Sequence, residues 1–91
     1  MSQPVHKVFA SVRTTHGPDG GTVLDTENGR MYGLNYVGSR ILDLLTSGLR
    51  QIEIVDRIQS EFAIDRRTAE NDVRDFLLTL QQRGLIEAQP A

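Results

Sequence analysis

The chain has 91 residues, 38% of them hydrophobic, a formal net charge of −2 and no cysteine. This length suits one domain with a single hydrophobic core, which we expect over residues 1–91 with the core at about 7–87. Without cysteine, disulfides and thiolate metal sites are excluded. The sequence contains no apolar stretch of the roughly 20 residues that a membrane span needs, and no signal-peptide pattern. We therefore expect a cytoplasmic protein without a membrane partner.

The first element is predicted to be a strand. Residues 7–14 alternate in character, with Val8, Ala10 and Val12 on one side, which is the spacing of a strand. The cluster HGPDGG at 16–21 contains the residue types that favour turns. We therefore expect the first strand to end there.

Two further strands are predicted after this turn, at 22–26 and 30–35. They flank Asn28-Gly29, a pair typical of tight hairpins because both central residues of such turns need positive φ. We expect an antiparallel meander whose third strand lies at an edge of the sheet.

The predicted edge strand, residues 30–35, lacks the Lys or Pro that commonly protects such an edge. Met31, Tyr32 and Leu34 place apolar side chains on both of its faces, and Gly33 leaves a gap. Two explanations stay open on the residues alone. Met31 simply lies on the outer face, or a peptide strand adds to this edge.

After Asn35 the hydrophobic period becomes helical. Asn35 predicts the N-cap of a first helix that stops near Gly48. A second helix is predicted over residues 51–62, and Asp65 predicts the cap of a third that ends at Gly84. The expected fold is a small α+β domain with a three-stranded antiparallel sheet followed by three helices, in a winged-helix-turn-helix-like arrangement.

The end of the chain, residues 85–91, is predicted to be a short apolar return followed by a fraying tail. In the third helix, a projection at 100° steps gives a core stripe of Ala69, Val73, Phe76 and Leu80. We call the two sides of this stripe its shoulders. Going around the helix from the stripe, one shoulder carries Leu77, then Arg74 and then Leu78. The other shoulder carries Asp72, Thr79 and Arg83. A wide apolar arc with charged margins suits a helix that closes a groove beside a strand.

Residues for catalysis or metal binding are scarce. His6 and His16 have no cysteine partner, and we interpret them as exposed loop histidines. Asp72 and Asp75 are neighbours on the third helix, but paired carboxylates catalyse only in a pocket that shifts a pKa. We expect no catalytic site, no metal and no cofactor.

Binding of nucleic acid is disfavoured by charge. The third helix would be the recognition helix, and four arginines against three acidic residues leave it only +1: Arg66, Arg67, Arg74 and Arg83 against Glu70, Asp72 and Asp75. The chain after this helix is also short for a wing. We therefore expect no nucleic-acid partner, although a winged-helix DNA-binding regulator remains the alternative.

Four blocks carry a resemblance to a known family: VLDTENGRMYGLN, VGSRILDLL, IVDRIQSEFAID and AENDVRDFLLTLQQRGLI. From about Gly21 to Glu87 the chain resembles the PqqD-like domains, the RiPP recognition elements that bind leader peptides of ribosomally made natural products. It is most similar to the discrete leader-binding proteins of lasso-peptide biosynthesis. HGPDGG is a longer first turn than the family pattern implies.

The resemblance implies a non-enzymatic protein whose third strand receives the leader antiparallel, in a groove against the third helix. The strand residues it implies are Arg30, Met31, Tyr32, Gly33 and Leu34. Because periodicity leaves open which helix shoulder faces the strand, the helix candidates come from both: Asp72, Arg74, Asp75, Phe76, Leu77 and Thr79. The partners implied are the leader, a leader peptidase and a macrolactam cyclase. A further alternative is a structural subunit whose free strand edge pairs with its own copy.

Overall fold

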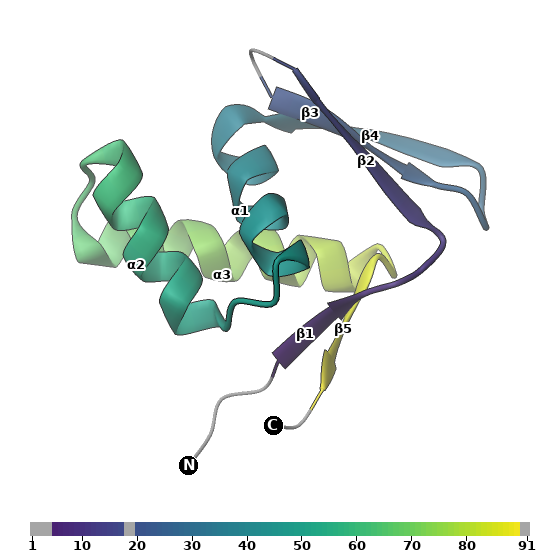
Figure 1. Cartoon of the computed structure of the whole chain (residues 1–91). Coiled ribbons are helices and arrows are strands. Elements are labelled where there is room, and N and C mark those ends of the chain that lie inside the picture. The colour runs from purple at the N-terminus through teal and green to yellow at the C-terminus, as the bar shows by residue number, and fades with distance from the viewer. Residues whose placement is uncertain (1–4, 18–19, 90–91) are drawn as a thin grey trace.

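The computed structural model describes residues 5–17 and 20–89 of the chain (Figure 1). Their elements, in chain order, are β1 (Val5–Val8), β2 (Val12–Gly17), β3 (Gly20–Asp25), β4 (Arg30–Asn35), α1 (Tyr36–Thr46), α2 (Gln51–Phe62), α3 (Arg66–Gln82) and β5 (Ile86–Gln89). The predicted α+β class is confirmed, with the antiparallel sheet β2-β3-β4 followed by three helices. A second sheet, β1-β5, was not predicted.

The prediction of one strand over 7–14 is wrong. The chain turns after Val8, where the Val12 amide donates to the Phe9 carbonyl at 3.0 Å, and β2 begins only at Val12. β1 instead pairs antiparallel with β5, with Val8 opposite Ile86. The alternation across residues 7–14 is a local pattern, so it carried no sign that the first half pairs with a segment about 80 residues later.

At the end of the chain, the predicted short apolar return is confirmed, but the fraying tail after it is wrong as far as residue 89, because β5 occupies Ile86–Gln89. Leu85 and Ile86 are only 1% and 2% exposed, and β5 begins at Ile86. These two side chains anchor the chain that follows α3 to the hydrophobic core. Residues 90–91 lie outside the described part of the chain.

The first hairpin is tighter than its turn-rich sequence suggested. β2 and β3 continue to the pair Gly17↔Gly20, so most of the cluster at 16–21 belongs to strands. Residues 18–19 lie outside the described part. The second hairpin is confirmed, since β3 and β4 pair from Gly20↔Asn35 to Asp25↔Arg30. The turn type is wrong: the connection comprises residues 26–29, and of Asn28 and Gly29 only Gly29 has positive φ, at +66°.

The Asp25 carboxylate organises the second hairpin turn. It accepts hydrogen bonds from the Glu27 amide (3.1 Å), the Asn28 amide (3.2 Å) and the Asn28 side-chain amide (2.8 Å). The Asn28 side chain contributes most to a pKa that lies below the ordinary value of 3.8. Because the folded-state pKa is lowered, this carboxylate stabilises the fold above pH 3.8 and stops doing so as the pH falls through the lowered pKa.

We therefore expect Asp25→Asn to lower the melting temperature at pH 7 and to have a progressively smaller effect as the pH falls below 3.8 through the lowered pKa of Asp25. The asparagine keeps an acceptor oxygen but not the charge that the three donors favour. Thermal unfolding of both proteins between pH 2 and 7 measures the difference. A melting-temperature difference that does not change with pH would contradict this role for the charge.

The predicted helix ends agree closely with the structure. Asn35 caps α1 by accepting the Gly38 amide at 2.7 Å, and Asp65 caps α3 by accepting the Thr68 amide at 2.7 Å. Gly48 and Gly84 follow α1 and α3 with φ of +92° and +71°.

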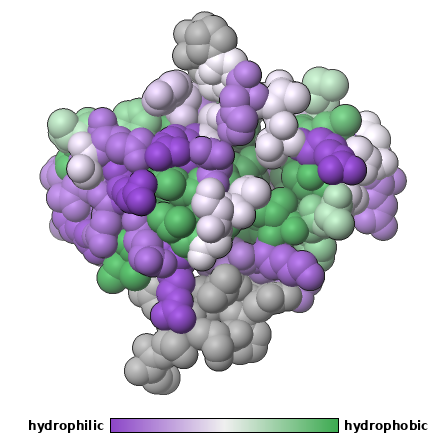
Figure 2. All heavy atoms as spheres, viewed as in Figure 1, coloured by the Kyte–Doolittle hydropathy of each residue, from purple (hydrophilic) through white to green (hydrophobic). Residues whose placement is uncertain are grey.

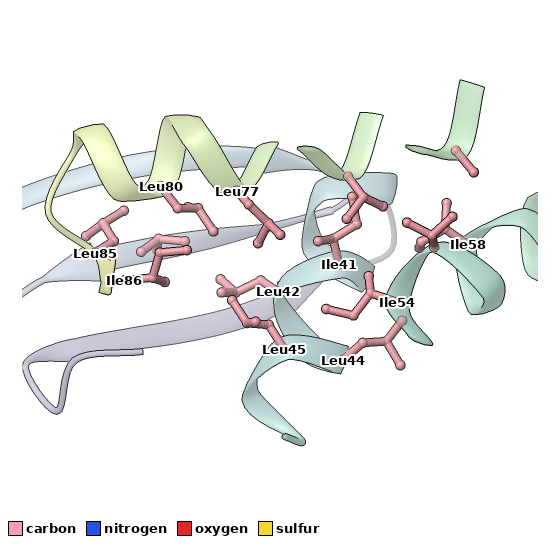
Figure 3. Close-up of a cluster of buried hydrophobic side chains, with 14 residues drawn as sticks. Ile41, Leu42, Leu44, Leu45, Ile54, Ile58, Leu77, Leu80, Leu85 and Ile86 are labelled. Carbon is pink, nitrogen blue, oxygen red and sulfur yellow. The ribbon is translucent and has the colours of Figure 1, made fainter. Parts of the chain in front are cut away.

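The helices and the sheet share one hydrophobic core. α1 packs on β3 and α2, while α2 packs on α3, so that α1 lies between the three-stranded sheet and α2 (Figure 1). On the face shown in Figure 2, hydrophobic residues form separate patches among hydrophilic ones. Figure 3 shows the cluster beneath, to which α1 contributes four residues: Ile41, Leu42, Leu44 and Leu45.

The predicted core stripe of α3 needs one correction. Ala69, Val73 and Leu80 are buried as expected, but the fourth core residue is Leu77, at 3% exposed, and not Phe76. Phe76 is half-buried and packs at the margin of the cluster. α3 is therefore rotated relative to the prediction, because its orientation is set by contact with α2 and β5, which periodicity does not report.

Candidate functional site

β4 is the end strand of its sheet and, in the described part of the chain, pairs only with β3. Tyr32 and Leu34 pack against the core, whereas Met31 points to the other face and is 70% exposed. Met31 lies opposite Leu24, also partly exposed, so one pair of apolar side chains occupies the outer face. An added Cβ at Gly33 would meet no atom within 4 Å, which leaves space beside the strand.

A groove runs between β4, the first turn of α1 and α3. It consists of two cavities of about 330 and 320 Å³ that share Thr79. The first is lined by Asn35, Val37, Gly38, Ile41, Asp72, Asp75, Phe76 and Thr79. The second is lined by Val23, Met31, Tyr32, Gly33, Thr79, Leu80, Arg83 and Leu85. We refer to these residues together as the groove.

Most of the predicted site residues line this groove: Met31, Tyr32, Gly33, Asp72, Asp75, Phe76 and Thr79. Arg30, Leu34, Arg74 and Leu77 do not line either cavity. Leu77 is in the core, and Arg74 is exposed with its Nε 3.5 Å from Asp75. The α3 shoulder that faces β4 is therefore the one with Asp72, Thr79 and Arg83.

Sequence reasoning missed the wall that α1 contributes. Val37, Gly38 and Ile41 line the first cavity, and a Cβ on Gly38 would lie 2.9 Å from Cε1 of Phe76. Glycine thus lets the aromatic ring lie against the start of the helix. The signal available was Asn35, whose cap places the first turn of α1 directly after the edge strand.

The far end of the groove is closed by a contact between α3 and β4. The Arg83 guanidinium lies over the Tyr32 ring, 4.5 Å from its centroid, in the geometry of a cation–π interaction. This contact holds the C-terminal end of α3 beside the strand. The helical projection places Arg83 on the correct shoulder but does not reveal its contact with Tyr32.

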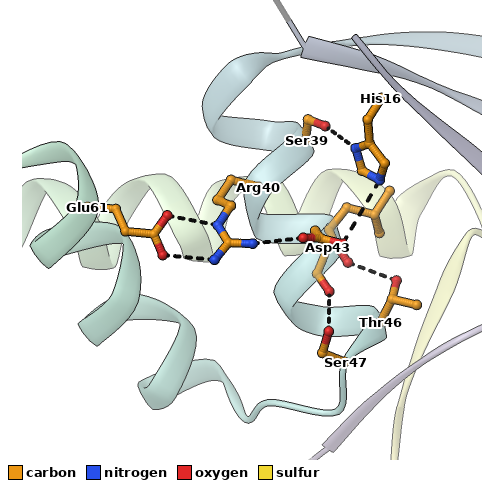
Figure 4. A network of polar contacts seen from close by, with 8 residues as sticks. His16, Ser39, Arg40, Asp43, Thr46, Ser47 and Glu61 are labelled. Atoms are coloured by element: carbon orange, nitrogen blue, oxygen red, sulfur yellow. Dashed lines mark hydrogen bonds and ion pairs between the residues drawn. The ribbon is translucent and has the colours of Figure 1, made fainter. Parts of the chain in front are cut away.

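A separate polar network joins β2, α1 and α2 (Figure 4). His16 Nδ1 lies 2.9 Å from Ser39 Oγ, and His16 Nε2 lies 4.0 Å from Asp43. Arg40 donates to Asp43 at 2.7 Å and to both carboxylate oxygens of Glu61 at 2.8 and 3.0 Å. The paired charges raise the pKa of Arg40 and lower that of Glu61, with the hydrogen bond between them as the main cause.

This network contains serine, histidine and aspartate, but its geometry is that of a cross-link. Ser39 is 6% exposed, and Asp43 is bound by Arg40 rather than free to orient the imidazole. The histidines were expected to be exposed and in loops. His16 is exposed, but both lie in strands, His16 in β2 and His6 in β1, where burial lowers the pKa of His6.

Residues 5–17 and 20–89 contain no group of three or more His, Cys, Asp or Glu residues placed to hold a metal ion. None of the helices in these ranges has both the length and the apolar character that crossing a membrane requires.

Comparisons with known proteins agree with this architecture. The chain is similar to a structure described as TbiB1 in complex with the TbiA(beta) leader peptide, with 41% identity, a TM-score of 0.84, and coverage of 93% of this chain and 99% of that one. A lasso peptide synthetase B1 complexed with the leader peptide shares the fold, with 20% identity, a TM-score of 0.81, and coverage of 91% and 98%. No curated protein sequence matches.

The family described as coenzyme PQQ synthesis protein D matches residues 20–86, from the start of β3 to the start of β5. The match thus includes β4, α1 and α3, the three elements that form the groove. The chain belongs to the PqqD family.

Proposed function

We propose that this protein binds the leader segment of a ribosomally made precursor peptide as an added strand on β4. The observation that carries the proposal is the edge of β4 that no other described strand pairs with and that faces α3 across the groove. It is supported by the similarity to TbiB1, a protein whose structure contains a leader peptide. Strand addition uses the backbone groups that an edge strand leaves free.

The energetics require the groove as well as the edge. Each backbone hydrogen bond contributes roughly 0.5–1.5 kcal/mol net, while ordering each peptide residue costs about 1–2 kcal/mol. Backbone pairing alone therefore comes close to zero. Micromolar affinity corresponds to about −8 kcal/mol, so several leader side chains must be buried, at roughly 1.5–3 kcal/mol each. The apolar groove residues Val37, Ile41 and Phe76 offer that burial in the first cavity.

In this proposal the protein itself catalyses no step and acts in the cytoplasm. It presents the bound leader to a leader peptidase and a macrolactam-forming cyclase, the partners that the family resemblance implies. The groove would hold the leader while the rest of the precursor stays free for the enzymes.

Hydrogen exchange followed by NMR tests the strand addition directly. Along β4, successive amides point alternately toward β3 and away from it. Adding the leader of the protein's own precursor should therefore slow exchange at every second amide between Arg30 and Asn35, with little change at the others. The amides of α2, which does not line the groove, serve as the internal reference.

Two results would count against the proposal. Binding without slowed exchange in β4 would show that the leader does not add to this edge. Tight, salt-dependent binding to a specific DNA fragment, measured by anisotropy, would favour the regulator alternative instead.

A further inference from the structure

The two ends of the groove carry opposite charge. At the end next to α1, Asp72 and Asp75 line the first cavity together with apolar side chains. Asp72 forms no ion pair within residues 5–17 and 20–89, and the contact of Asp75 is its sequence neighbour Arg74, with Nε at 3.5 Å. Both aspartates are exposed, so their charge is available to a bound molecule.

At the other end the charge is positive. Arg83 lines the second cavity and has no carboxylate partner in the described part of the chain. It lies over the face of the Tyr32 ring, 4.5 Å from the ring centroid, and such stacking leaves the guanidinium edge free to donate hydrogen bonds. Arg30, two positions before Tyr32, begins β4 and is also exposed.

The direction of β4 relates these charges to the direction of a bound peptide. β4 runs from Arg30, at the basic end, to Asn35, which lines the acidic cavity. A peptide added antiparallel runs the opposite way, so its N-terminal part lies beside Asp72 and Asp75. Its C-terminal part lies beside Arg83.

The length of the groove sets the spacing. Asp72 and Arg83 are eleven positions apart on α3, which at 1.5 Å per residue is about 16 Å. An extended peptide covers about 16 Å in about five residues, at roughly 3.3 Å per residue.

Resting on the proposed function, we propose that the groove selects leaders by charge polarity. The preferred leader carries Lys or Arg at the position facing Asp72 and Asp75, and Asp or Glu about five residues later, facing Arg83. The apolar side chains between these positions supply burial, and the charged pair fixes register and direction. A leader with the opposite polarity would bring like charges together at both ends.

A displayed library of random 16-residue peptides, selected on the full chain, tests this charge preference without assuming any leader sequence. Enriched peptides should carry a basic residue about five positions before an acidic one. Hydrogen exchange with one enriched peptide then shows whether it adds to β4.

Charge reversal gives the second measurement. For an enriched peptide, Asp72→Lys should raise the dissociation constant at least about tenfold, in line with the loss of a charge-assisted contact. Changing the basic residue of the peptide to Glu should restore much of that loss. Glu70→Lys is the matched control, because it makes the same charge change on α3 at a residue that does not line the groove. Arg83→Glu and its control Arg67→Glu test the other end in the same way.

Each outcome has a separate meaning. Peptides that slow exchange in β4 but show no polarity, or the reversed polarity, overturn this inference and leave the proposed function standing. Equal effects of Asp72→Lys and Glu70→Lys do the same. If no peptide binds, or if bound peptides leave β4 unprotected, the proposed function fails and this inference fails with it.

Discussion

Gly20→Ala is expected to lower the free energy of unfolding by about 3 kcal/mol or more, from backbone strain combined with overpacking. Gly20 has φ +145°, a region that L-residues rarely adopt. A Cβ at this position would also lie 2.0 Å from the carbonyl oxygen of Leu34 in β4. Since backbone atoms on both sides of the contact are held by the β3–β4 pairing, the clash cannot be relieved by a side-chain movement.

Gly33→Ala is the matched control in the neighbouring strand. A Cβ at Gly33 meets nothing within 4 Å, so the change should stay within about 0.5 kcal/mol, as is usual for surface positions. Urea denaturation of both variants gives the two free energies. Equal stability of the variants would show that the register Gly20↔Asn35, and with it the position of the groove beside β4, is wrong.

Leu77→Ala and Phe76→Ala are expected to separate the core from the groove. Leu77 is 3% exposed, so its truncation should cost about 2–5 kcal/mol of stability. The half-buried Phe76 ring lines the groove, and its truncation should cost less stability. If a leader side chain packs on this ring, losing roughly 1.5–3 kcal/mol of apolar burial raises the dissociation constant about tenfold to a hundredfold.

Thermal unfolding together with titration of labelled leader peptide measures both effects. The titrations should be run well below the melting temperature of the Leu77→Ala variant, so that folded protein is compared with folded protein. The expected pattern is a low melting temperature with retained affinity for Leu77→Ala, and the reverse for Phe76→Ala. A Phe76→Ala variant that keeps full affinity would contradict the assignment of this ring to the leader site.

Much of the fold could be predicted because its signals are local. The caps Asn35 and Asp65 bond to amides three residues later, and the connection between β3 and β4 contains Gly29, whose φ is positive. Hydrophobic period distinguishes strands from helices over a few residues. The element types and their order from β3 to α3 followed from these signals.

The second sheet could not be predicted in this way. β1 and β5 are short, and each is defined by the other across the whole length of the chain. The same applies to His16, whose partner Ser39 is 23 positions away. Contacts of this kind form only when distant segments pack together. The local sequence around each residue does not indicate which distant residue will be its partner.

The candidate site lies between these two cases. Two elements suited to a groove are visible in the sequence: an edge strand without Lys or Pro, and a helix with charged shoulders. Which shoulder faces the strand depends on the rotation of α3, and a projection at 100° steps cannot decide between neighbouring positions. Packing decided it: burying Leu77 against the core turned Phe76 toward Gly38, and so placed Asp72, Thr79 and Arg83 beside β4.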